Sequence, residues 1–398
     1  MNLSFDNTKV AFAYKTTKEL KSAKNLFSTM KFPVLTTIGA RCTPFLMKTG
    51  LPINGIIRGT IFKQFVGGES LEQTAPLCDM LNNYEVGVIL DYGVEGKESE
   101  ESFDQGMEEF IRVIAFAATQ KNIPVIAIKV SGIARFELLR KLNEAPRLRS
   151  GVHENEQQLA EWARVRERMI KICEAAKANN IGVVVDAEES WVQDPIDRLT
   201  MEMMELYNKD QVLVYNTIQL YRHDRLDFLK MSHEIAKREN FFLGVKLVRG
   251  AYMEKERARA EQMGYPSPIQ KDKDSTDLDY NNALLYCVEN IDSIGFVVAT
   301  HNEASSLYAA ELLDQKGLPH NHPHVHFSQL YGMSDNITFN LAKNGYRVSK
   351  YVPFGPIRDV IPYLMRRAQE NSSVKGQTGR ELSLIKEELS RRKQVEEA

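Results

Sequence analysis

The sequence is poor in cysteine, and its four cysteines stand far apart. Cys42, Cys78, Cys173 and Cys287 form no CxxC pair. We therefore expect four reduced thiols in a cytosol-like compartment, and neither a disulfide framework nor a cysteine-ligated zinc ion. The histidine-rich run at 320–326 (HNHPHVH) is also a weak metal motif, because it holds no carboxylate and the chain has no HExxH.

Long apolar segments and an excess of charge are missing too. No apolar run reaches the roughly 20 residues that a membrane-spanning helix needs, and the first residues lack the apolar core of a signal peptide. The formal net charge is −2, which gives no electrostatic basis for binding nucleic acid. We expect a cytoplasmic globular protein.

What the sequence does contain is a series of short segments rich in β-branched residues. They are VGVIL (86–90), PVIAIKV (124–130), IGVVVD (181–186), QVLVYNTI (211–218), FLGVKLV (242–248), GFVVAT (295–300), HVHFSQL (324–330) and YRVSKYV (346–352). Several are nearly all apolar, which is typical of strands buried on both faces. Between them lie stretches with helical periodicity, such as 159–179 and 227–239.

Eight strands that alternate with helices predict an α/β fold, a parallel (β/α)8 barrel. The main alternative is an open, doubly wound sheet. That fold usually carries GxGxxG after its first strand, and the motif does not occur in this sequence.

The chain divides into three predicted parts. Residues 1–82 lack the strand–helix rhythm and contain Pro33, Pro44 and Pro52 among amphipathic pieces, so we expect a helical arm. Residues 83–378 form the barrel. Residues 379–398 are highly charged, with Leu382 and Ile385 at helical spacing, and predict a C-terminal helical tail.

Polar residues follow the predicted strands, and in a barrel the chemistry lies at the carboxyl ends of the strands. These residues are Asp91, Tyr92, Glu95, Lys129, Asp186, Glu188, Gln219, Lys246, Arg249, Thr300, His301, Asn302, Gln329, Tyr331, Lys350 and Tyr351. Any single one could be a capping or loop residue. A complete ring of polar residues at one end of the barrel is harder to explain by structure alone. Charges gathered there are partly removed from water, and this is costly unless a ligand or partner compensates them.

The helix that follows the last strand is a candidate anion site. It is predicted from Asp359 to Asn371, with Pro362 in its first turn. One side of the predicted helix carries Val360, Ile361, Leu364 and Ala368, and the other carries Tyr363, Arg366, Arg367 and Glu370. Paired arginine forks suit a carboxylate or phosphate. The alternative is a solvated face with an Arg366–Glu370 pair.

Seven segments between Val86 and Ser373 resemble signature stretches of the proline dehydrogenase family. They are AIKVSG, VVVDAEES, KLVRGAYMEKERARA, ATHNE, FSQLYGM, SKYVPFGP and YLMRRAQENSS. They are closer to the single-function, mitochondrial-type enzymes than to the bacterial bifunctional proteins. The resemblance implies a distorted (β/α)8 barrel that binds FAD without a Rossmann motif.

The resemblance also implies roles for individual residues in the reaction. Arg366 and Arg367 would hold the proline carboxylate, and Glu95 would orient an arginine. Lys129 would contact the substrate and pair with a carboxylate. Three side chains would enclose the pyrrolidine ring, namely Leu330, Tyr351 and Tyr363. Asp186 would lie near the isoalloxazine ring of the flavin.

A further set would bind the cofactor. It comprises Gln219, Lys246, Val248, Arg249, Gly250, Ala251, Tyr252, Thr300, His301, Asn302, Gln329, Arg367 and Glu370. Lys246 stands where the bifunctional members have arginine. Lysine offers a charge and a donor but no fork, so its detailed contact differs from theirs.

The implied reaction is hydride transfer from proline C5 to flavin N5, which yields 1-pyrroline-5-carboxylate in the first step of proline catabolism. A quinone would accept the electrons, with peripheral contact at the inner face of a membrane. A separate aldehyde dehydrogenase would take the product. Two alternatives are a flavin-free barrel with a Schiff-base lysine (Lys129 or Lys246) and a non-catalytic binding barrel.

Overall fold

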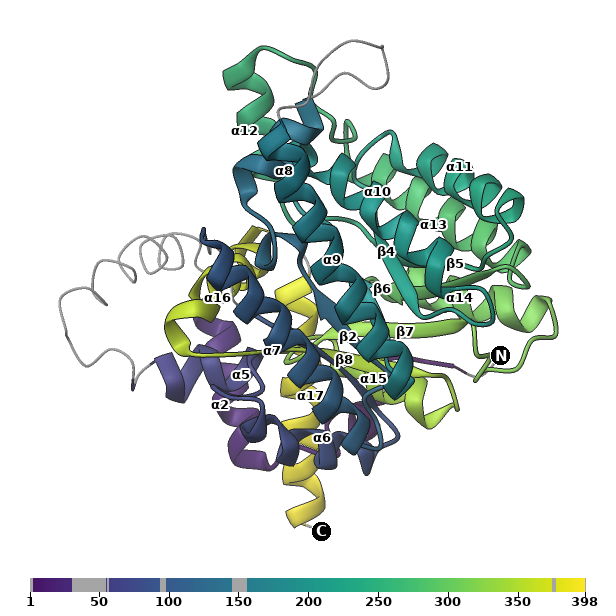
Figure 1. Ribbon diagram of the computed structural model, residues 1–398. Coiled ribbons are helices and arrows are strands. Elements are labelled where there is room, and N and C mark those ends of the chain that lie inside the picture. Colours follow the sequence, from purple (N-terminus) through teal and green to yellow (C-terminus); the bar gives the residue numbers. More distant parts are fainter. Residues whose placement is uncertain are drawn as a thin grey trace. The chain divides into compact units, whose positions relative to one another are not determined.

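The computed structural model describes residues 3–30, 55, 57–93, 98–144, 156–373 and 377–397, without the side chains of 368–373 and 377. Eight parallel strands close into a barrel in chain order (Figure 1). The strands are β1 (Gly87–Tyr92), β2 (Val125–Ile128), β3 (Gly182–Val185), β4 (Val214–Gln219), β5 (Leu243–Val248), β6 (Ile294–Ala299), β7 (Val325–Leu330) and β8 (Val348–Phe354). Each overlaps a predicted segment, with ends that differ by a few residues, so the predicted fold class is confirmed.

The chain divides into two compact units. We call residues 1–93 with 328–398 the first unit and residues 94–327 the second unit. The first unit holds α1 (Thr8–Ala11), α2 (Thr17–Met30), η1 (Arg58–Phe62), α5 (Lys63–Phe65), η2 (Glu72–Thr74), α6 (Ala75–Asn82), α15 (Asp335–Lys343), α16 (Ile357–Ser373) and α17 (Gln377–Glu397). The described parts of the N-terminal and C-terminal segments are therefore largely helical, while the division into arm, barrel and tail stays a prediction.

The second unit contains β2 to β6 and the helices between them. These are α7 (Glu100–Thr119), η3 (Val130–Gly132), α8 (Phe136–Glu144), α9 (Glu156–Asn179), α10 (Ser190–Tyr207), α11 (Arg225–Arg238), α12 (Met253–Met263), α13 (Lys273–Glu289) and α14 (Glu303–Gln315). Strands β2 to β6 pair in parallel, each with the next. Gly244 allows β5 to approach β4, because a Cβ there would lie 2.2 Å from the Val214 carbonyl oxygen.

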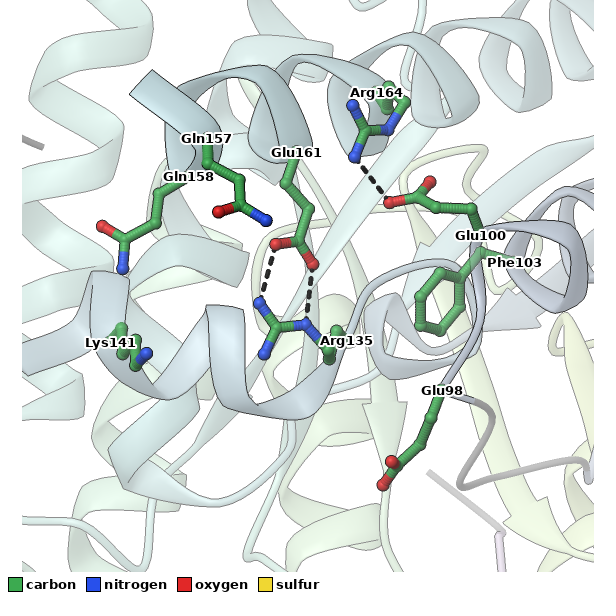
Figure 2. A pocket seen from close by; sticks show the side chains of 9 residues that line it. All are labelled: Glu98, Glu100, Phe103, Arg135, Lys141, Gln157, Gln158, Glu161 and Arg164. Atoms are coloured by element: carbon green, nitrogen blue, oxygen red, sulfur yellow. Dashed lines mark hydrogen bonds and ion pairs between the residues drawn. The ribbon is translucent and has the colours of Figure 1, made fainter. Parts of the chain in front are cut away.

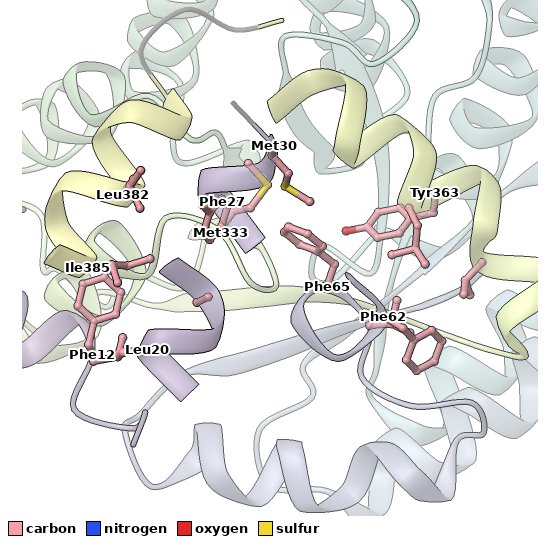
Figure 3. Close-up of a cluster of buried hydrophobic side chains, with 14 of the residues drawn as sticks. Phe12, Leu20, Phe27, Met30, Phe62, Phe65, Met333, Tyr363, Leu382 and Ile385 are labelled. Atoms are coloured by element: carbon pink, nitrogen blue, oxygen red, sulfur yellow. The ribbon is translucent and has the colours of Figure 1, made fainter. Parts of the chain in front are cut away.

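The hydrophobic core of the first unit joins helices from the beginning and the end of the chain. Figure 3 shows Phe12 and Leu20 beside Ile385 of α17, and Phe65 of α5 close to Tyr363 of α16. Helix α17 packs on α2, and the predicted apolar residues Leu382 and Ile385 are 4% and 1% exposed. Burial of such aliphatic side chains contributes about 1.5–3 kcal/mol each.

Helix α16 corrects two details of the sequence prediction. It begins at Ile357, so Pro362 lies inside the helix and not in its first turn. Tyr363 does not lie on an exposed polar face, because it is 7% exposed and belongs to the same buried cluster as Val360 and Leu364. The apolar stripe is therefore wide enough to include the tyrosine ring, which is itself largely apolar.

A group of buried charges lies next to β8 in the first unit. Asp335 accepts hydrogen bonds from the Tyr14 hydroxyl at 2.8 Å and from Lys15 Nζ at 3.0 Å. Lys350 is fully buried, with its Nζ 2.9 Å from Asp335 Oδ1. Glu381 of α17 accepts a hydrogen bond from the backbone N–H of Ser334. The segment between α1 and α2 is thus tied to Asp335, and α17 is tied to the neighbouring Ser334.

Glu381 is expected to make the protein less stable as the pH rises. Burial, with the charge of Asp335, raises the pKa of Glu381 to about 7, from 4.5 for an ordinary glutamate. Between pH 4.5 and about 7, the folded state therefore retains a proton on Glu381 that the unfolded state has released. The contribution of Glu381 to the free energy of unfolding is complete below pH 4.5. It is lost as the pH rises through about 7, and the free energy of unfolding falls by up to about 1.4 kcal/mol per pH unit.

Urea unfolding between pH 4.5 and 8 measures this slope. Glu381→Gln stays neutral and should flatten it, whereas Glu387→Gln, which alters an exposed residue of the same helix, should leave it unchanged. Equal slopes for the wild type and Glu381→Gln would contradict the assignment.

The three described cysteines are buried thiols without disulfides. Burial raises the pKa of Cys78 to about 11 and that of Cys173 to about 12. These thiols are therefore protonated and poorly reactive near neutral pH. Cys42 lies outside the described residues. Every helix in the described ranges is too short or too polar to traverse a bilayer.

Candidate active site

Three predicted site residues meet at the carboxyl ends of strands in the second unit. Lys129 follows β2, Asp186 follows β3, and Lys246 lies on β5. Asp186 accepts a hydrogen bond from Lys246 Nζ through Oδ1, and its Oδ2 lies 3.8 Å from Lys129 Nζ. All three are at most 9% exposed. We call these residues the lysine–aspartate cluster.

The local sequence explains why these three charges converge. The strands β2, β3, β4 and β5 pair in parallel and in order, so their carboxyl ends form one edge. Thr217 of β4 donates a hydrogen bond to the Val185 carbonyl oxygen at 2.8 Å and so ties β4 to the end of β3. A buried carboxylate with two ammonium partners is stable only when its charge is compensated, and here both partners are supplied by strand ends.

Gln219 is the last residue of β4, and only one of its two polar side-chain atoms is hydrogen-bonded within the described residues. Its Nε2 donates to the Glu188 carbonyl oxygen at 2.8 Å. Its Oε1 is buried and has no hydrogen-bond partner among the described residues. A buried acceptor without a partner costs about 1–3 kcal/mol, so this atom marks a place where a ligand donor would be stabilising.

Arg249, directly after β5, is held in place by three side chains. It donates to Asp277 at 2.7 Å, to the Thr300 hydroxyl at 2.7 Å and to the Ser305 hydroxyl at 2.9 Å. Its guanidinium also stacks 4.3 Å from the centre of the Tyr280 ring. An arginine fixed in this way is preorganised for an anion, since little side-chain entropy remains to be lost on binding.

The loop after Arg249 depends on a glycine. Gly250 has φ +138°, and a Cβ at this position would lie 2.5 Å from the Tyr221 ring. Val248 is the last residue of β5, while Ala251 and Tyr252 lead into α12, where Tyr252 is the N-cap. The loop is therefore a tight backbone turn followed by a helix N-terminus, an arrangement that commonly binds phosphate oxygens.

The residues after β6 have a structural role that is already visible. The side chain of Asn302 caps α14 by accepting a hydrogen bond from Ser305 N at 3.1 Å. Thr300 accepts one from Asn302 N at 3.1 Å. His301 lies between them and is half-buried. Capping accounts for Asn302, and cofactor binding by these three residues stays a prediction.

The other predicted residues lie in the first unit. Gln329 and Leu330 end β7, and Tyr351 lies on β8, with its carbonyl oxygen accepting from Tyr331 N at 2.9 Å. Arg366 is half-buried and Arg367 is 6% exposed. The guanidinium carbon of Arg367 lies 5.2 Å from the centre of the Tyr363 ring. A cation on an aromatic face is stabilised by about 0.5–2 kcal/mol and is held in a defined direction.

Two predicted residues lie outside what the structure describes. Glu95 falls in 94–97, and the side chain of Glu370 falls in 368–373. Their predicted roles, and the alternative Arg366–Glu370 pair, remain predictions.

A cavity of the second unit lies away from these residues. It has a volume of about 500 Å³ and is lined by α7, α8 and α9. Figure 2 shows its charges largely paired, with Arg135 on Glu161 and Arg164 on Glu100. The Arg164 hydrogen bond lowers the pKa of Glu100 to about 2. None of the predicted site residues lines it, and its satisfied ion pairs offer little to a ligand.

The histidine run at 320–326 is accounted for by local hydrogen bonds. His324 Nδ1 lies 2.6 Å from the Ile291 carbonyl oxygen, and His320 Nε2 lies 3.1 Å from Asp314. Within the described ranges, no three His, Cys, Asp or Glu side chains gather as metal ligands do.

Sequence reasoning left one charged residue of the site without a role. Glu188 is 5% exposed, and its Oε1 accepts a hydrogen bond from Ser131 N at 3.0 Å. Its position two residues after Asp186, at the end of a buried strand, was the only signal in the sequence.

Comparisons with known proteins agree with the motifs. The family model described as "Proline dehydrogenase" matches residues 76–380. "Proline dehydrogenase 1, mitochondrial" of Dictyostelium discoideum is 33% identical over 385 residues, covering 87% of this chain and 67% of that protein. "Carbapenem antibiotics biosynthesis protein CarD" of Pectobacterium carotovorum is 34% identical over 328 residues, covering 82% of this chain and 83% of that protein.

The fold is also found in solved structures. Proline utilization A (PutA) from Bdellovibrio bacteriovorus superimposes with a TM-score of 0.75 at 18% identity. The match covers 94% of this chain and 42% of that one, so the chain spans less than half of the PutA protein. At this identity the likeness establishes the fold alone.

Proposed function

Because the chain belongs to the proline dehydrogenase family, we propose that it oxidises L-proline to 1-pyrroline-5-carboxylate with FAD as its cofactor. The observation that supports this most directly is the lysine–aspartate cluster, in which two lysines and one carboxylate are buried at strand ends. A barrel has no structural need for these charges at that place, whereas a charged cofactor and an amino-acid substrate do.

The residues of the second unit fit a flavin. Gln219 has a buried acceptor without a partner among the described residues, and Lys246 adds a donor and a positive charge. The loop from Val248 to Tyr252, with the fixed Arg249, would hold the phosphates, and Thr300, His301, Asn302, Gln329, Arg367 and Glu370 would complete the binding set. FAD, when bound, supplies the hydride acceptor N5 for proline C5.

The remaining residues would bind and orient the substrate. Arg366 and Arg367 pair with the proline carboxylate through their forks, and Glu95 fixes an arginine. Lys129 contacts the substrate while Asp186 balances its charge. Leu330, Tyr351 and Tyr363 form an apolar wall for the ring. Correct orientation of C5 alone can supply several kcal/mol of the barrier reduction.

The wider setting follows from the same proposal. A quinone would take the electrons, which calls for peripheral contact with a membrane, and the chain would work in the cytoplasm at its inner face. The product would pass to an aldehyde dehydrogenase on a separate chain. The predicted parts 1–82, 83–378 and 379–398 would act as arm, catalytic barrel and tail.

A visible spectrum of the purified protein tests the proposal. Oxidised flavin bands that bleach on anaerobic addition of L-proline would support both cofactor and substrate. Bands that do not respond to proline would require a different substrate. Absence of flavin after reconstitution with FAD would overturn the proposal, and borohydride trapping of a carbonyl substrate would then favour the Schiff-base lysine.

Tyr351 is expected to exclude 4-hydroxyproline by its bulk. In the wild type, kcat/KM for proline should exceed that for hydroxyproline. Replacing Tyr351 with serine should reduce this preference by about tenfold or more, because the smaller side chain leaves room for the hydroxyl group. Tyr351→Phe keeps the ring and should keep the wild-type ratio. Comparable turnover of both substrates by the wild type would contradict this role.

A further inference from the structure

Helix α12, which follows the Val248–Tyr252 loop, is attached to the second unit by little apolar packing. Its buried residues are Glu256 and Ala260, and the side chain of Glu256 is fully buried. Most helices in proteins are stabilised by packing an apolar face, whereas α12 buries one alanine and one carboxyl group. The attachment of this helix therefore depends largely on the polar contacts of Glu256.

Both carboxylate oxygens of Glu256 accept hydrogen bonds from Ser190, the first residue of α10. Oε1 accepts from the backbone N–H at 2.7 Å, and Oε2 accepts from the hydroxyl group at 2.6 Å. The N-cap residue of α10, Glu189, makes no capping hydrogen bond with its own side chain. Glu256 thus supplies, from another helix, the acceptor that a capping residue would provide, and its charge lies at the positive end of the α10 dipole.

Two neighbouring contacts join the same two helices. Lys255 forms an ion pair with Glu189, and the guanidinium carbon of Arg259 lies 4.5 Å from the centre of the Trp191 ring. We call these two contacts, together with the two hydrogen bonds of Glu256, the α10–α12 clamp. Lys255 is exposed, so its ion pair contributes little, and Glu256 makes the buried contact of the clamp.

The clamp acts on the first turn of α12, directly after the loop. The backbone N–H of Glu256 donates to the carbonyl oxygen of Tyr252, the N-cap residue of α12, at 2.9 Å. The other end of the loop is held by Tyr221, whose N–H donates to the Arg249 carbonyl oxygen at 2.7 Å and whose ring would lie 2.5 Å from a Cβ at Gly250. The loop is therefore fixed at both ends, by Tyr221 and by the clamp.

We propose that Glu256 is a positioning residue for the cofactor, which acts through Ser190 to keep the Val248–Tyr252 loop in the shape that binds the FAD phosphates. The inference rests on the proposed function, which assigns this loop to FAD. A loop that is ordered only when its ligand binds lowers the affinity by the free energy of that ordering. Without the contacts of Glu256, FAD should bind more weakly although every residue proposed to contact it is unchanged.

The first test is the dissociation constant of FAD, measured by titrating the apoprotein and following flavin fluorescence. Glu256→Leu removes both acceptors and should raise this Kd by about tenfold or more. At saturating FAD and L-proline, its rate of flavin bleaching should stay within about threefold of the wild type, because the residues proposed to act on the substrate are intact.

Two results of this test would overturn the inference. One is a Kd for FAD within about threefold of the wild-type value. The other is a bleaching rate that stays more than about threefold low at saturating FAD, since this would show damage to the site and not a loss of cofactor binding.

Matched variants show whether Glu256 acts through Ser190. Glu256→Gln can accept from the Ser190 N–H and donate to its hydroxyl group, so its Kd for FAD should stay within about threefold of the wild type. Ser190→Ala should weaken FAD binding by itself and add nothing to Glu256→Leu. Glu261→Leu alters an exposed residue of the same helix and should leave the Kd unchanged. Additive effects of Ser190→Ala and Glu256→Leu would overturn the inference.

Limited proteolysis of the apoprotein separates this inference from the proposed function. Trypsin can cleave α12 after Arg259, whose neighbours in the sequence are the same in the wild type and in Glu256→Leu. Cleavage there should be about tenfold faster in the variant, because α12 opens more easily without its buried contact. Cleavage at the wild-type rate would overturn the inference whatever the cofactor. A wild-type protein that does not bind FAD would instead contradict the proposed function.

Discussion

Replacing Asp186 with asparagine is expected to abolish flavin bleaching by proline and to lower the free energy of unfolding by about 3–5 kcal/mol. Asparagine has nearly the same shape but no charge. It leaves Lys246 and Lys129 buried without the carboxylate that both of them face. Removing one partner of a buried ion pair is costly because the other charge stays desolvated.

The measurements are urea unfolding and flavin content of the purified variant. The matched control is Glu144→Gln, which breaks the exposed pair with Arg140 on α8 and should change stability by less than about 1 kcal/mol. An Asp186→Asn protein that keeps wild-type stability and bleaches normally with proline would show that the two lysines do not depend on this carboxylate.

Replacing Arg367 with methionine is expected to reduce kcat/KM for proline by roughly 30-fold to 5,000-fold, corresponding to about 2–5 kcal/mol. Methionine preserves much of the side-chain volume against Tyr363 and removes the fork. The loss should appear mainly in KM if the carboxylate contact forms in the ground state, and in kcat as well if orientation of C5 suffers.

Helix α16 supplies its own control for this experiment. Arg358 lies in the same helix, but its side chain is 80% exposed and is paired with the neighbouring Asp359. Arg358→Met should change kcat/KM by less than about twofold. If both variants lost activity equally, the effect would reflect damage to the helix and not loss of a substrate contact.

The strands were predictable because strands buried on both faces appear in the sequence as short, nearly continuous apolar segments rich in β-branched residues. Segments such as IGVVVD and GFVVAT become β3 and β6, and their polar last residues fall at the strand ends. That regularity was enough to predict the closed barrel. It also placed Lys129, Asp186 and Lys246 among the polar residues expected at the strand ends.

What the sequence could not give is which charges meet. The hydrogen bond from Ser131 to Glu188 joins residues 57 positions apart, and periodicity carries no information about such pairs. The same limit applies to Tyr363, where the width of the buried stripe of α16 depends on Phe65 and other residues far away in the chain. The roles of Glu95 and Glu370 rest on the resemblance alone, because both fall outside what the structure describes.

The buried charges around Asp335 have a consequence for the order of folding. Thr8 bonds to Glu388 across a separation of 380 positions, and Lys15 reaches Asp335 across 320. Contacts this remote have a high loop-closure cost and form late. During synthesis, Leu20 and Phe27 are expected to stay exposed until α17 has been made and can cover them. Nascent chains with exposed apolar surface tend to aggregate in this interval. The first unit, which begins the sequence, is therefore expected to be the last part of the chain to reach its native packing.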